Sequence, residues 1–199
     1  CCPAFVNMIR KHYPEQADLI STTVSPMCMI SRMLKAKEPD CYTVFIGPCI
    51  GKKSEVVDQQ IEGNADAVLT YSEIRAIMKA KDVELEPAPN EYQESSAYGK
   101  RYGNAGGVTA SVLEYMKETD QEVDAMECKK AMLLLKAGRL PEDFVEGMIC
   151  EGGCVGGPSG YADPMKTKKV RDKLIDEADD RSITGNLKNY DMSAFEQHR

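Results

Sequence analysis

The sequence predicts an α/β fold in which mainly parallel sheets are flanked by helices. Short runs of β-branched and aromatic residues, best seen in the Tyr-Thr-Val-Phe-Ile of residues 42–46, alternate with longer amphipathic stretches. The chain has 199 residues, 42% of them hydrophobic and 29% charged, which is typical of one large globular domain or two small lobes.

The N-terminal part is predicted to be helical over residues 3–39. Pro3 suits the first position of one helix, and Ser25-Pro26 suits the start of another. The run at 42–46, ended by Gly-Pro, predicts a buried strand, and a polar helix is expected over 52–61.

A second short strand is predicted at 67–69, followed by Thr70-Tyr71-Ser72-Glu73, which has the spacing of a capping box. The helix that it opens places Ile74, Ile77 and Met78 on one face. We expect a third strand at 83–86 and a long loop over 87–107, rich in Pro, Asn, Ser and Gly.

Two further helices and a strand complete the pattern. One helix carries Val108, Val112, Leu113 and Met116 on one side, and another, over 129–137, ends at Gly138. Residues 144–149 form a strand candidate that leads into Cys150. We therefore divide the chain into a helical segment (1–40), an α/β core (41–160) and a charged, helical C-terminal tail (161–199).

Composition excludes several classes of function. A net charge of −7 argues against nucleic acid and anionic membranes as partners. No apolar run approaches the roughly 20 residues of a membrane span, and no signal peptide is recognisable, so we expect a cytoplasmic protein. The chain begins at Cys1 rather than Met, which suggests a fragment.

Cysteine is the best candidate to carry chemistry, because neither of the two histidines lies in a recognisable motif. The eight cysteines include three local patterns. They are Cys1-Cys2-Pro3, Pro48-Cys49-x-x-Lys52-Lys53-x-Glu55, and Met148-x-Cys150-x-x-x-Cys154-x-Gly156-Gly157.

These patterns favour a metal site with thiolate ligands. Cys49 and Cys150 each follow a predicted strand, and sites in parallel sheets form beyond the carboxyl ends of strands. Gly152 and Gly153 allow the backbone to wrap a compact object, and Lys52 and Lys53 could compensate thiolate charge. A soft thiolate set suits an iron–sulfur cluster or zinc.

Plainer interpretations remain open. We expect Cys28, Cys41 and Cys128 to be inert buried residues, since no motif surrounds them. Disulfides and a structural zinc site are alternatives for the other cysteines, although zinc ribbons usually pair two close knuckles. Lys52 and Glu55, taken alone, predict a surface ion pair of little consequence.

Together the three patterns resemble the signatures of the [FeFe]-hydrogenase (iron-only hydrogenase) catalytic domain. The family pattern is Thr-Ser-Cys-Cys-Pro, then Pro-Cys-x-x-Lys-Lys-x-Glu, then Glu-x-Met-x-Cys-x-Gly-Gly-Cys-x-x-Gly-Gly. Weaker matches are Ser25-Pro26, Asp66-Ala67-Val68-Leu69-Thr70 and Tyr102-Gly103-Asn104-Ala105-Gly106-Gly107-Val108, and all lie in the family's order.

The resemblance implies the C-terminal portion of a two-lobed domain that makes or oxidises hydrogen (2H⁺ + 2e⁻ ⇌ H₂) at an H-cluster. A [4Fe–4S] cubane would be held by Cys2, Cys49, Cys150 and Cys154. Cys154 would also bridge to a diiron subcluster that carries CO, cyanide and a dithiolate.

The resemblance also implies roles for residues near the diiron unit. Lys52 would donate a hydrogen bond to cyanide, Met148 would pack against the diiron unit, and Gly103 would let the backbone approach a diatomic ligand. Cys1 would pass protons, with Glu55 and Ser21 further along the relay. The implied partners are H₂ and protons, an electron carrier such as ferredoxin or fused iron–sulfur domains, and the missing N-terminal part of the same domain.

Departures from the family pattern keep two further functions open. Gly47 stands where well-studied members have Met, Met27 where they have Gln, and Pro158 interrupts a glycine run. These changes suggest a divergent, hydrogen-sensing hydrogenase. A non-enzymatic iron–sulfur protein of the cytosolic cluster-assembly type is the other alternative. We expect the isolated chain to be inactive and to hold at most a partial cluster.

Overall fold

The computed structural model describes residues 1–86 and 95–199, without the side chains of 126–130. The chain forms two compact units. The first contains Cys1–Leu85, Gly157–Tyr161 and Asp191–Arg199, and the second contains Glu86–Gly156 and Ala162–Tyr190. Each unit holds one small parallel sheet, so the predicted α/β class with mainly parallel pairing is confirmed.

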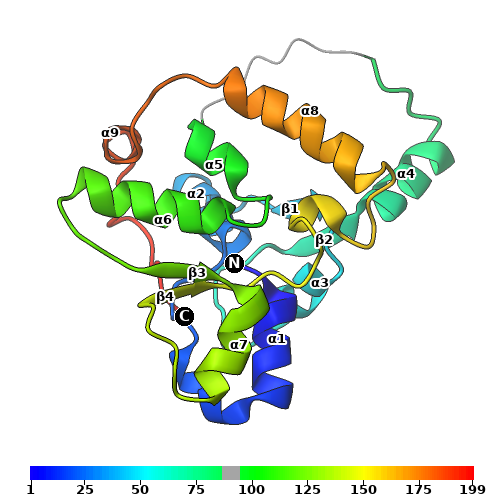
Figure 1. The fold of residues 1–199 in the computed structure, drawn as a ribbon. Coiled ribbons are helices and arrows are strands. Elements are labelled where there is room, and N and C mark those ends of the chain that lie inside the picture. The colour runs from blue at the N-terminus through cyan, green and yellow to red at the C-terminus, as the bar shows by residue number, and fades with distance from the viewer. Residues whose placement is uncertain (87–94) are drawn as a thin grey trace. The chain divides into compact units, whose positions relative to one another are not determined.

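Helices α1 (Pro3–His12), η1 (Pro14–Leu19) and α2 (Pro26–Lys37) fill the predicted helical segment of the first unit (Figure 1). Pro3 opens α1 in its first turn, as predicted. Pro26 does the same for α2, and the Ser25 hydroxyl caps that helix by accepting from the Cys28 amide at 3.4 Å.

Strands β1 (Val44–Gly47) and β2 (Ala67–Thr70) pair in parallel, with Val44 opposite Ala67. One face of this sheet covers a small core formed by Met27, Ala65 and Val68, with Phe45 and Val56 packed against it. The prediction of a buried strand at 42–46 is wrong in one respect. Because side chains alternate along a strand, Val44 and Ile46 lie on the opposite face, where they are 44% and 46% exposed.

Helices α3 (Gly51–Val56) and α4 (Tyr71–Ala80) follow the two strands. The polar helix predicted over 52–61 ends five residues early, because the chain turns after Val57. The capping box is confirmed: the Thr70 hydroxyl accepts from the Glu73 amide, and the Glu73 carboxylate accepts from the Thr70 amide at 2.8 Å.

Two sequence predictions after α4 are wrong. Residues 83–86 form no strand, because the Val83 amide bonds to the Met78 carbonyl at 2.9 Å and so ends the helix. The predicted loop over 87–107 contains helix α5 (Ala97–Arg101), which Ser96 caps through the Gly99 amide, while 87–94 lie outside the described residues.

The second unit contains helices α6 (Gly107–Glu118), α7 (Cys128–Lys136), α8 (Pro164–Asp176) and α9 (Ile183–Leu187), with the turn η2 (Cys154–Gly156). Its strands are β3 (Ala125–Glu127), which the sequence did not suggest, and β4 (Phe144–Glu146), and they pair in parallel. Since β4 ends at Glu146, Cys150 does not follow the strand directly, and the strand predicted to reach 149 is shorter than expected.

The end of the chain returns to the first unit. Thr23 and His198 form an antiparallel bridge, the Val24 amide bonds to the Gln197 carbonyl at 3.0 Å, and the Arg199 amide bonds to the Thr22 carbonyl at 3.0 Å. The buried Arg32 guanidinium donates to the carbonyls of Glu196 and His198. Segment 191–199 therefore covers the turn between η1 and α2 as part of this unit.

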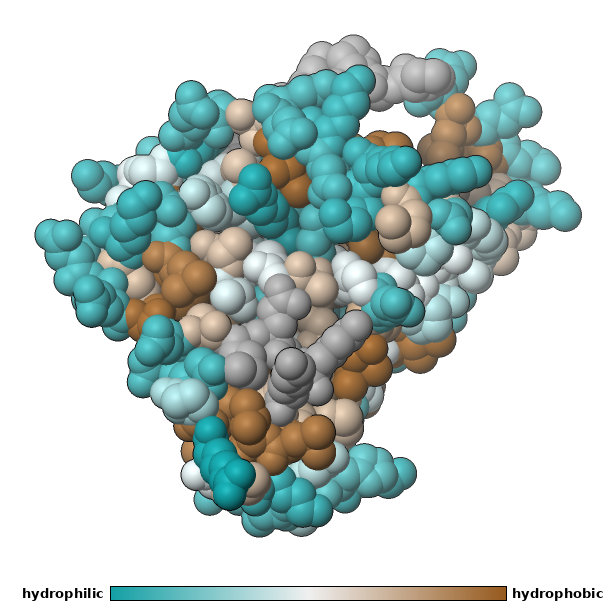
Figure 2. Space-filling model, in the orientation of Figure 1, coloured by the Kyte–Doolittle hydropathy of each residue, from teal (hydrophilic) through white to brown (hydrophobic). Residues whose placement is uncertain are grey.

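One face of the protein is largely polar. On the face shown in Figure 2, hydrophilic residues cover most of the area, and hydrophobic residues lie in separate patches. None of the helices in the described ranges has the length and apolar character that a bilayer crossing requires.

Candidate functional site

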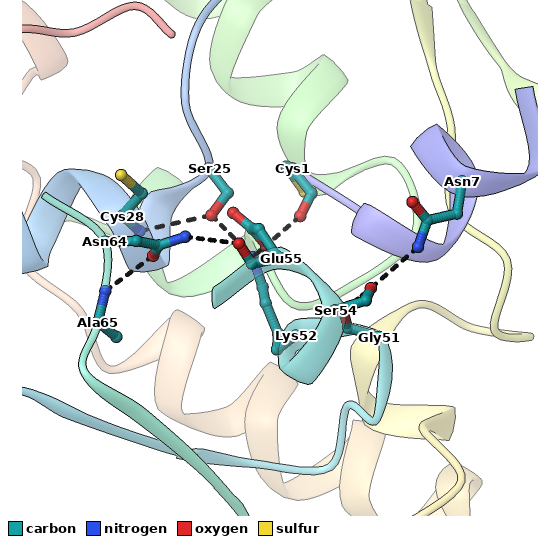
Figure 3. A network of polar contacts seen from close by, with 10 residues as sticks. All are labelled: Cys1, Asn7, Ser25, Cys28, Gly51, Lys52, Ser54, Glu55, Asn64 and Ala65. Carbon is teal, nitrogen blue, oxygen red and sulfur yellow. Dashed lines mark hydrogen bonds and ion pairs between the residues drawn. The ribbon is translucent and has the colours of Figure 1, made fainter. Parts of the chain in front are cut away.

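Lys52 lies at the centre of a polar network in the first unit (Figure 3). Its ammonium donates to a Glu55 carboxylate oxygen at 2.7 Å, to the Ser25 hydroxyl at 2.8 Å and to the Cys1 carbonyl at 3.4 Å. An ammonium group has three N–H donors, so this network uses all of them.

The Lys52–Glu55 pair is buried, with 7% of each residue exposed. The interpretation of these residues as a surface ion pair is therefore wrong, because α3 packs its inner face against α1 and β2. The Asn64 side chain donates to the Glu55 carbonyl at 3.1 Å and fixes the end of the helix. A buried pair of this kind places a fixed positive charge beside the Cys1 backbone.

The two candidate ligands of this unit sit at the starts of helices. Cys2 is the N-cap residue of α1, and Cys49 lies two residues before α3. A Cβ atom at Gly51 would lie 3.3 Å from the Ala4 amide nitrogen, so the first turns of α1 and α3 are in contact. The fold thus brings the backbone next to Cys2 close to the backbone next to Cys49, and helix N-termini favour negative charge.

The three cysteines of this unit's motifs differ in exposure. Cys1 is exposed, Cys2 and Cys49 are half-buried, and none of the three is in a disulfide. The Pro48 carbonyl accepts from the Ser159 amide at 3.2 Å, which ties the segment after the glycine-rich loop to the Cys49 turn.

Cys28 behaves as the inert residue that the sequence predicted. It is fully buried in the first unit, its thiol donates weakly to the Glu62 carbonyl, and burial raises the pKa of that thiol. Cys41 is only half-buried, so full burial is wrong there, and the Cys128 side chain lies outside the described part.

In the second unit, Cys150 and Cys154 flank a tight glycine turn. The Gly153 amide bonds to the Cys150 carbonyl at 3.0 Å, and the Gly156 amide bonds to the Gly153 carbonyl at 3.0 Å. Gly152 and Gly153 have φ values of +76° and +91°, which side chains rarely adopt.

The Gly103 loop packs directly on this turn. The Ala105 amide donates to the Gly152 carbonyl at 3.1 Å, and the Val155 amide donates to the Gly103 carbonyl at 3.4 Å. A Cβ atom at Gly153 would lie 2.5 Å from the Ala105 amide nitrogen, so only glycine fits. The structure therefore brings Gly103 together with the backbone between Cys150 and Cys154.

Glu146 matches the glutamate of the family pattern, but the sequence assigned it no role. Its buried carboxylate accepts from the Thr109 amide and hydroxyl at 2.8 Å each, and from the Gly106 amide at 3.2 Å. It thereby caps α6 and fixes the end of β4 four residues before Cys150. Burial, and after it the charge of Glu146, raises the pKa of the Tyr102 hydroxyl next to Gly103.

Two predicted site residues are less closely connected. Met148 is half-buried between β4 and Cys150. Ser21 is exposed, its hydroxyl accepts from the Thr23 amide, and its carbonyl accepts from the Arg199 side chain at 2.7 Å. Among the contacts of the described residues, none joins Ser21 directly to Glu55 or Cys1, so the structure does not connect that relay.

The predicted cluster ligands are divided between the units, with Cys2 and Cys49 in the first and Cys150 and Cys154 in the second. Within the described ranges, no three Cys, His, Asp or Glu side chains are gathered as a metal site. The donor set nevertheless fits an iron–sulfur cluster, because thiolates are its usual ligands and a turn of positive-φ glycines lies between two of them.

Several known proteins are similar in sequence to this chain. The chain is 27% identical over 230 residues to iron hydrogenase 1 of Clostridium pasteurianum, covering 88% of this chain and 40% of that protein. It is 26% identical over 208 residues to the periplasmic [Fe] hydrogenase large subunit of Nitratidesulfovibrio vulgaris, covering 79% of this chain and 49% of that protein. The chain thus spans less than half the length of either relative.

A cluster-assembly protein is also similar. The cytosolic Fe–S cluster assembly factor NAR1 of Kluyveromyces lactis is 31% identical over 94 residues, which cover 47% of this chain. The family described as "Iron only hydrogenase large subunit, C-terminal domain" matches residues 1–129 and 123–158. Since this match covers most of the sequence and contains every candidate ligand, the chain belongs to the family formed by the C-terminal domains of iron-only hydrogenase large subunits.

Proposed function

We propose that this chain forms the C-terminal part of a catalytic domain that interconverts protons, electrons and H₂. The observation that carries the proposal is the buried Lys52–Glu55 pair, whose ammonium also holds the Cys1 carbonyl. The ammonium contacts the backbone of the residue before Cys2, and a purely structural helix gains little from burying such a pair, which favours a role for Lys52 beside the cofactor.

In this proposal Cys2, Cys49, Cys150 and Cys154 hold a [4Fe–4S] cluster, and Cys154 also contacts a diiron unit. When bound, the cofactor supplies the redox chemistry and the site of hydrogen formation. The protein would supply orientation. Lys52 would turn its longest hydrogen bond, now made to the Cys1 carbonyl at 3.4 Å, toward the cofactor. Met148 would pack beside the cofactor, and the Gly103 backbone would border the site of a diatomic ligand.

The protein also handles protons in this proposal. Cys1 is an exposed residue directly before the N-cap position of α1, so its thiol would carry a proton between the cofactor and the network around Glu55. Ser21 would lie further along the proton path, and protons would reach it from Glu55 through intervening groups rather than by a direct contact. Electrons would come from a carrier such as ferredoxin or from fused iron–sulfur domains.

The test uses the full-length protein, reconstituted anaerobically with the diiron cofactor. We expect hydrogen evolution and infrared bands of CO and cyanide. Cys49→Ser should abolish both, whereas Cys41→Ser, a matched change at a half-buried cysteine outside the motifs, should leave both intact. Neither hydrogen nor infrared bands from the unmodified protein would overturn the proposal.

A second candidate function is cluster binding without hydrogen chemistry, which the similarity to the Kluyveromyces lactis assembly factor favours. That function predicts the optical spectrum of an iron–sulfur cluster and no CO or cyanide bands. A cytoplasmic location also stays a prediction, since one relative is named as periplasmic.

A further inference from the structure

Helix α8 reaches the Gly103 loop, although it lies beyond the residues matched to the family. From residue 161 onward, the sequence predicts only a charged surface tail. In the structure α8 packs against α5 and η2 within the second unit (Figure 1). Its residue Ile175 is buried. Two of its consecutive residues, Arg171 and Asp172, contact the loop that contains Gly103.

The Arg171 guanidinium lies against the Cα atom of Gly103. A Cβ atom at Gly103 would lie 3.1 Å from both Cζ and Nη2 of Arg171, and Nη2 donates a hydrogen bond to the Lys100 carbonyl at the end of α5. The Asp172 carboxylate accepts from the Asn104 amide group at 3.5 Å. The loop is therefore held by α8 on one side and by the Gly152–Gly153 turn on the other.

The contact between α8 and the Gly103 loop contains buried polar atoms that stability alone does not favour. Asn104 is 9% exposed, and its Oδ1 atom is buried with no hydrogen-bond partner within the described part of the protein. The same is true of the Arg171 Nε atom. Buried polar atoms without partners carry the full desolvation penalty, and their presence in a native fold calls for an explanation. We explain these atoms by a requirement that the Gly103 backbone be held in one geometry.

We propose that Arg171 is a positioning residue for the Gly103 loop, acting from the segment of the chain that follows the family match. Arginine suits this task because its planar group covers the glycine backbone and donates to a carbonyl at the same time. The role rests on the proposed function, in which Gly103 borders a diatomic ligand. The geometry itself can be tested without any cofactor.

Hydrogen exchange of the full-length protein without cofactor gives that test. Arg171→Met removes the donors and the planar group but keeps an unbranched side chain, and it should speed exchange at the Ala105 and Val155 amides about tenfold. Lys173→Met removes a charge from the exposed side of the same helix and should leave both amides unchanged. Equal exchange in the two variants would overturn the proposal.

Two more variants keep the test decisive if Arg171→Met loosens the whole second unit. Gly103→Ala should speed exchange at Ala105, because its methyl group meets the guanidinium. The double variant Gly103→Ala/Arg171→Ala should lose less protection at the Ala105 amide than the two single variants together, since the shorter side chain leaves room for the methyl group. Additive effects would show that the two residues do not interact.

The cofactor-loaded protein separates this inference from the proposed function. Arg171→Met should shift the infrared bands of CO and cyanide, while Lys173→Met should not. If the exchange results hold but the unmodified protein shows no such bands, the proposed function fails and the positioning geometry stands. If the bands are present and neither exchange nor band positions respond to Arg171→Met, the positioning role fails and the proposed function stands.

Discussion

Replacing Lys52 by Met should destabilise the protein far more than the same replacement at the next residue. Lys52→Met leaves the Glu55 carboxylate buried without its cation, and breaking a buried pair from one side costs about 3–5 kcal/mol. Lys53 pairs with Glu73 at 2.8 Å, but both side chains are 40% or more exposed. Lys53→Met should therefore change the free energy of unfolding by less than about 1 kcal/mol.

Urea unfolding followed by circular dichroism measures this difference. With a slope of about 2 kcal/mol per M, Lys52→Met should lower the midpoint by about 2 M. The double variant Lys52→Met/Glu55→Leu should recover a large part of that loss, because it removes the unpaired charge and leaves an apolar contact.

One result refutes the reasoning. If Lys52→Met and Lys53→Met have the same midpoint, the Lys52 ammonium is not the partner on which the buried Glu55 carboxylate depends.

Three further predictions concern single residues. Asp66→Asn should destabilise the protein at neutral pH. Hydrogen bonds, first from the Thr43 amide, hold the pKa of Asp66 at about 2 against an ordinary 3.8, so this difference should disappear as pH falls from about 4 to about 2 in acid unfolding. Gly153→Ala should cost clearly more free energy of unfolding than Gly138→Ala. Both have positive φ, worth about 1–2 kcal/mol, but a Cβ at Gly138 meets no atom within 4 Å, and equal losses would contradict the clash. Glu146→Gln should lower the pKa of the Tyr102 hydroxyl in a spectroscopic titration, since the Glu146 charge is one of the causes that raise it, and an unchanged or raised pKa would refute that cause.

The features predicted well from the sequence depend on neighbours along the chain. The capping box at Thr70 and the start of α2 at Ser25-Pro26 each form within four residues, so local pattern was sufficient. The parallel pairing of β1 with β2 also followed from order alone, because a helix between two strands leaves little other choice.

The features that were missed depend on contacts between distant segments. Lys52 and Glu55 are charged residues on a short helix, and only the packing of α3 reveals that they are buried. Glu146 lies at the end of a strand, where a buried charge is unfavourable, and only its hydrogen bonds to the start of α6 explain why it is tolerated there. Nothing in the charged sequence of α8 indicates that Arg171 would turn inward while Lys173 stays in solvent.

At the candidate site, too, local motifs were predicted from the sequence and long-range contacts were not. The resemblance picked out four cysteines, and the structure explains why their neighbours are glycines, prolines and a buried lysine. The division of the chain at 40 and 160 stays a prediction. The two compact units are discontinuous in sequence, and the chain passes from one unit to the other after Leu85, Gly156, Tyr161 and Tyr190.

The return of segment 191–199 to the first unit has a consequence for biosynthesis. Besides its bonds to the Glu62 carbonyl, Arg32 donates to two carbonyls of segment 191–199, and Thr22 and Val24 form backbone bonds with the same segment. These bonds to segment 191–199 can form only after the whole second unit has been synthesised. The first unit therefore cannot complete its hydrogen bonding while translation proceeds, although domains generally fold in order from the N-terminus. Deletion of residues 191–199 should thus disturb the first unit, although this segment directly follows the second unit in the sequence.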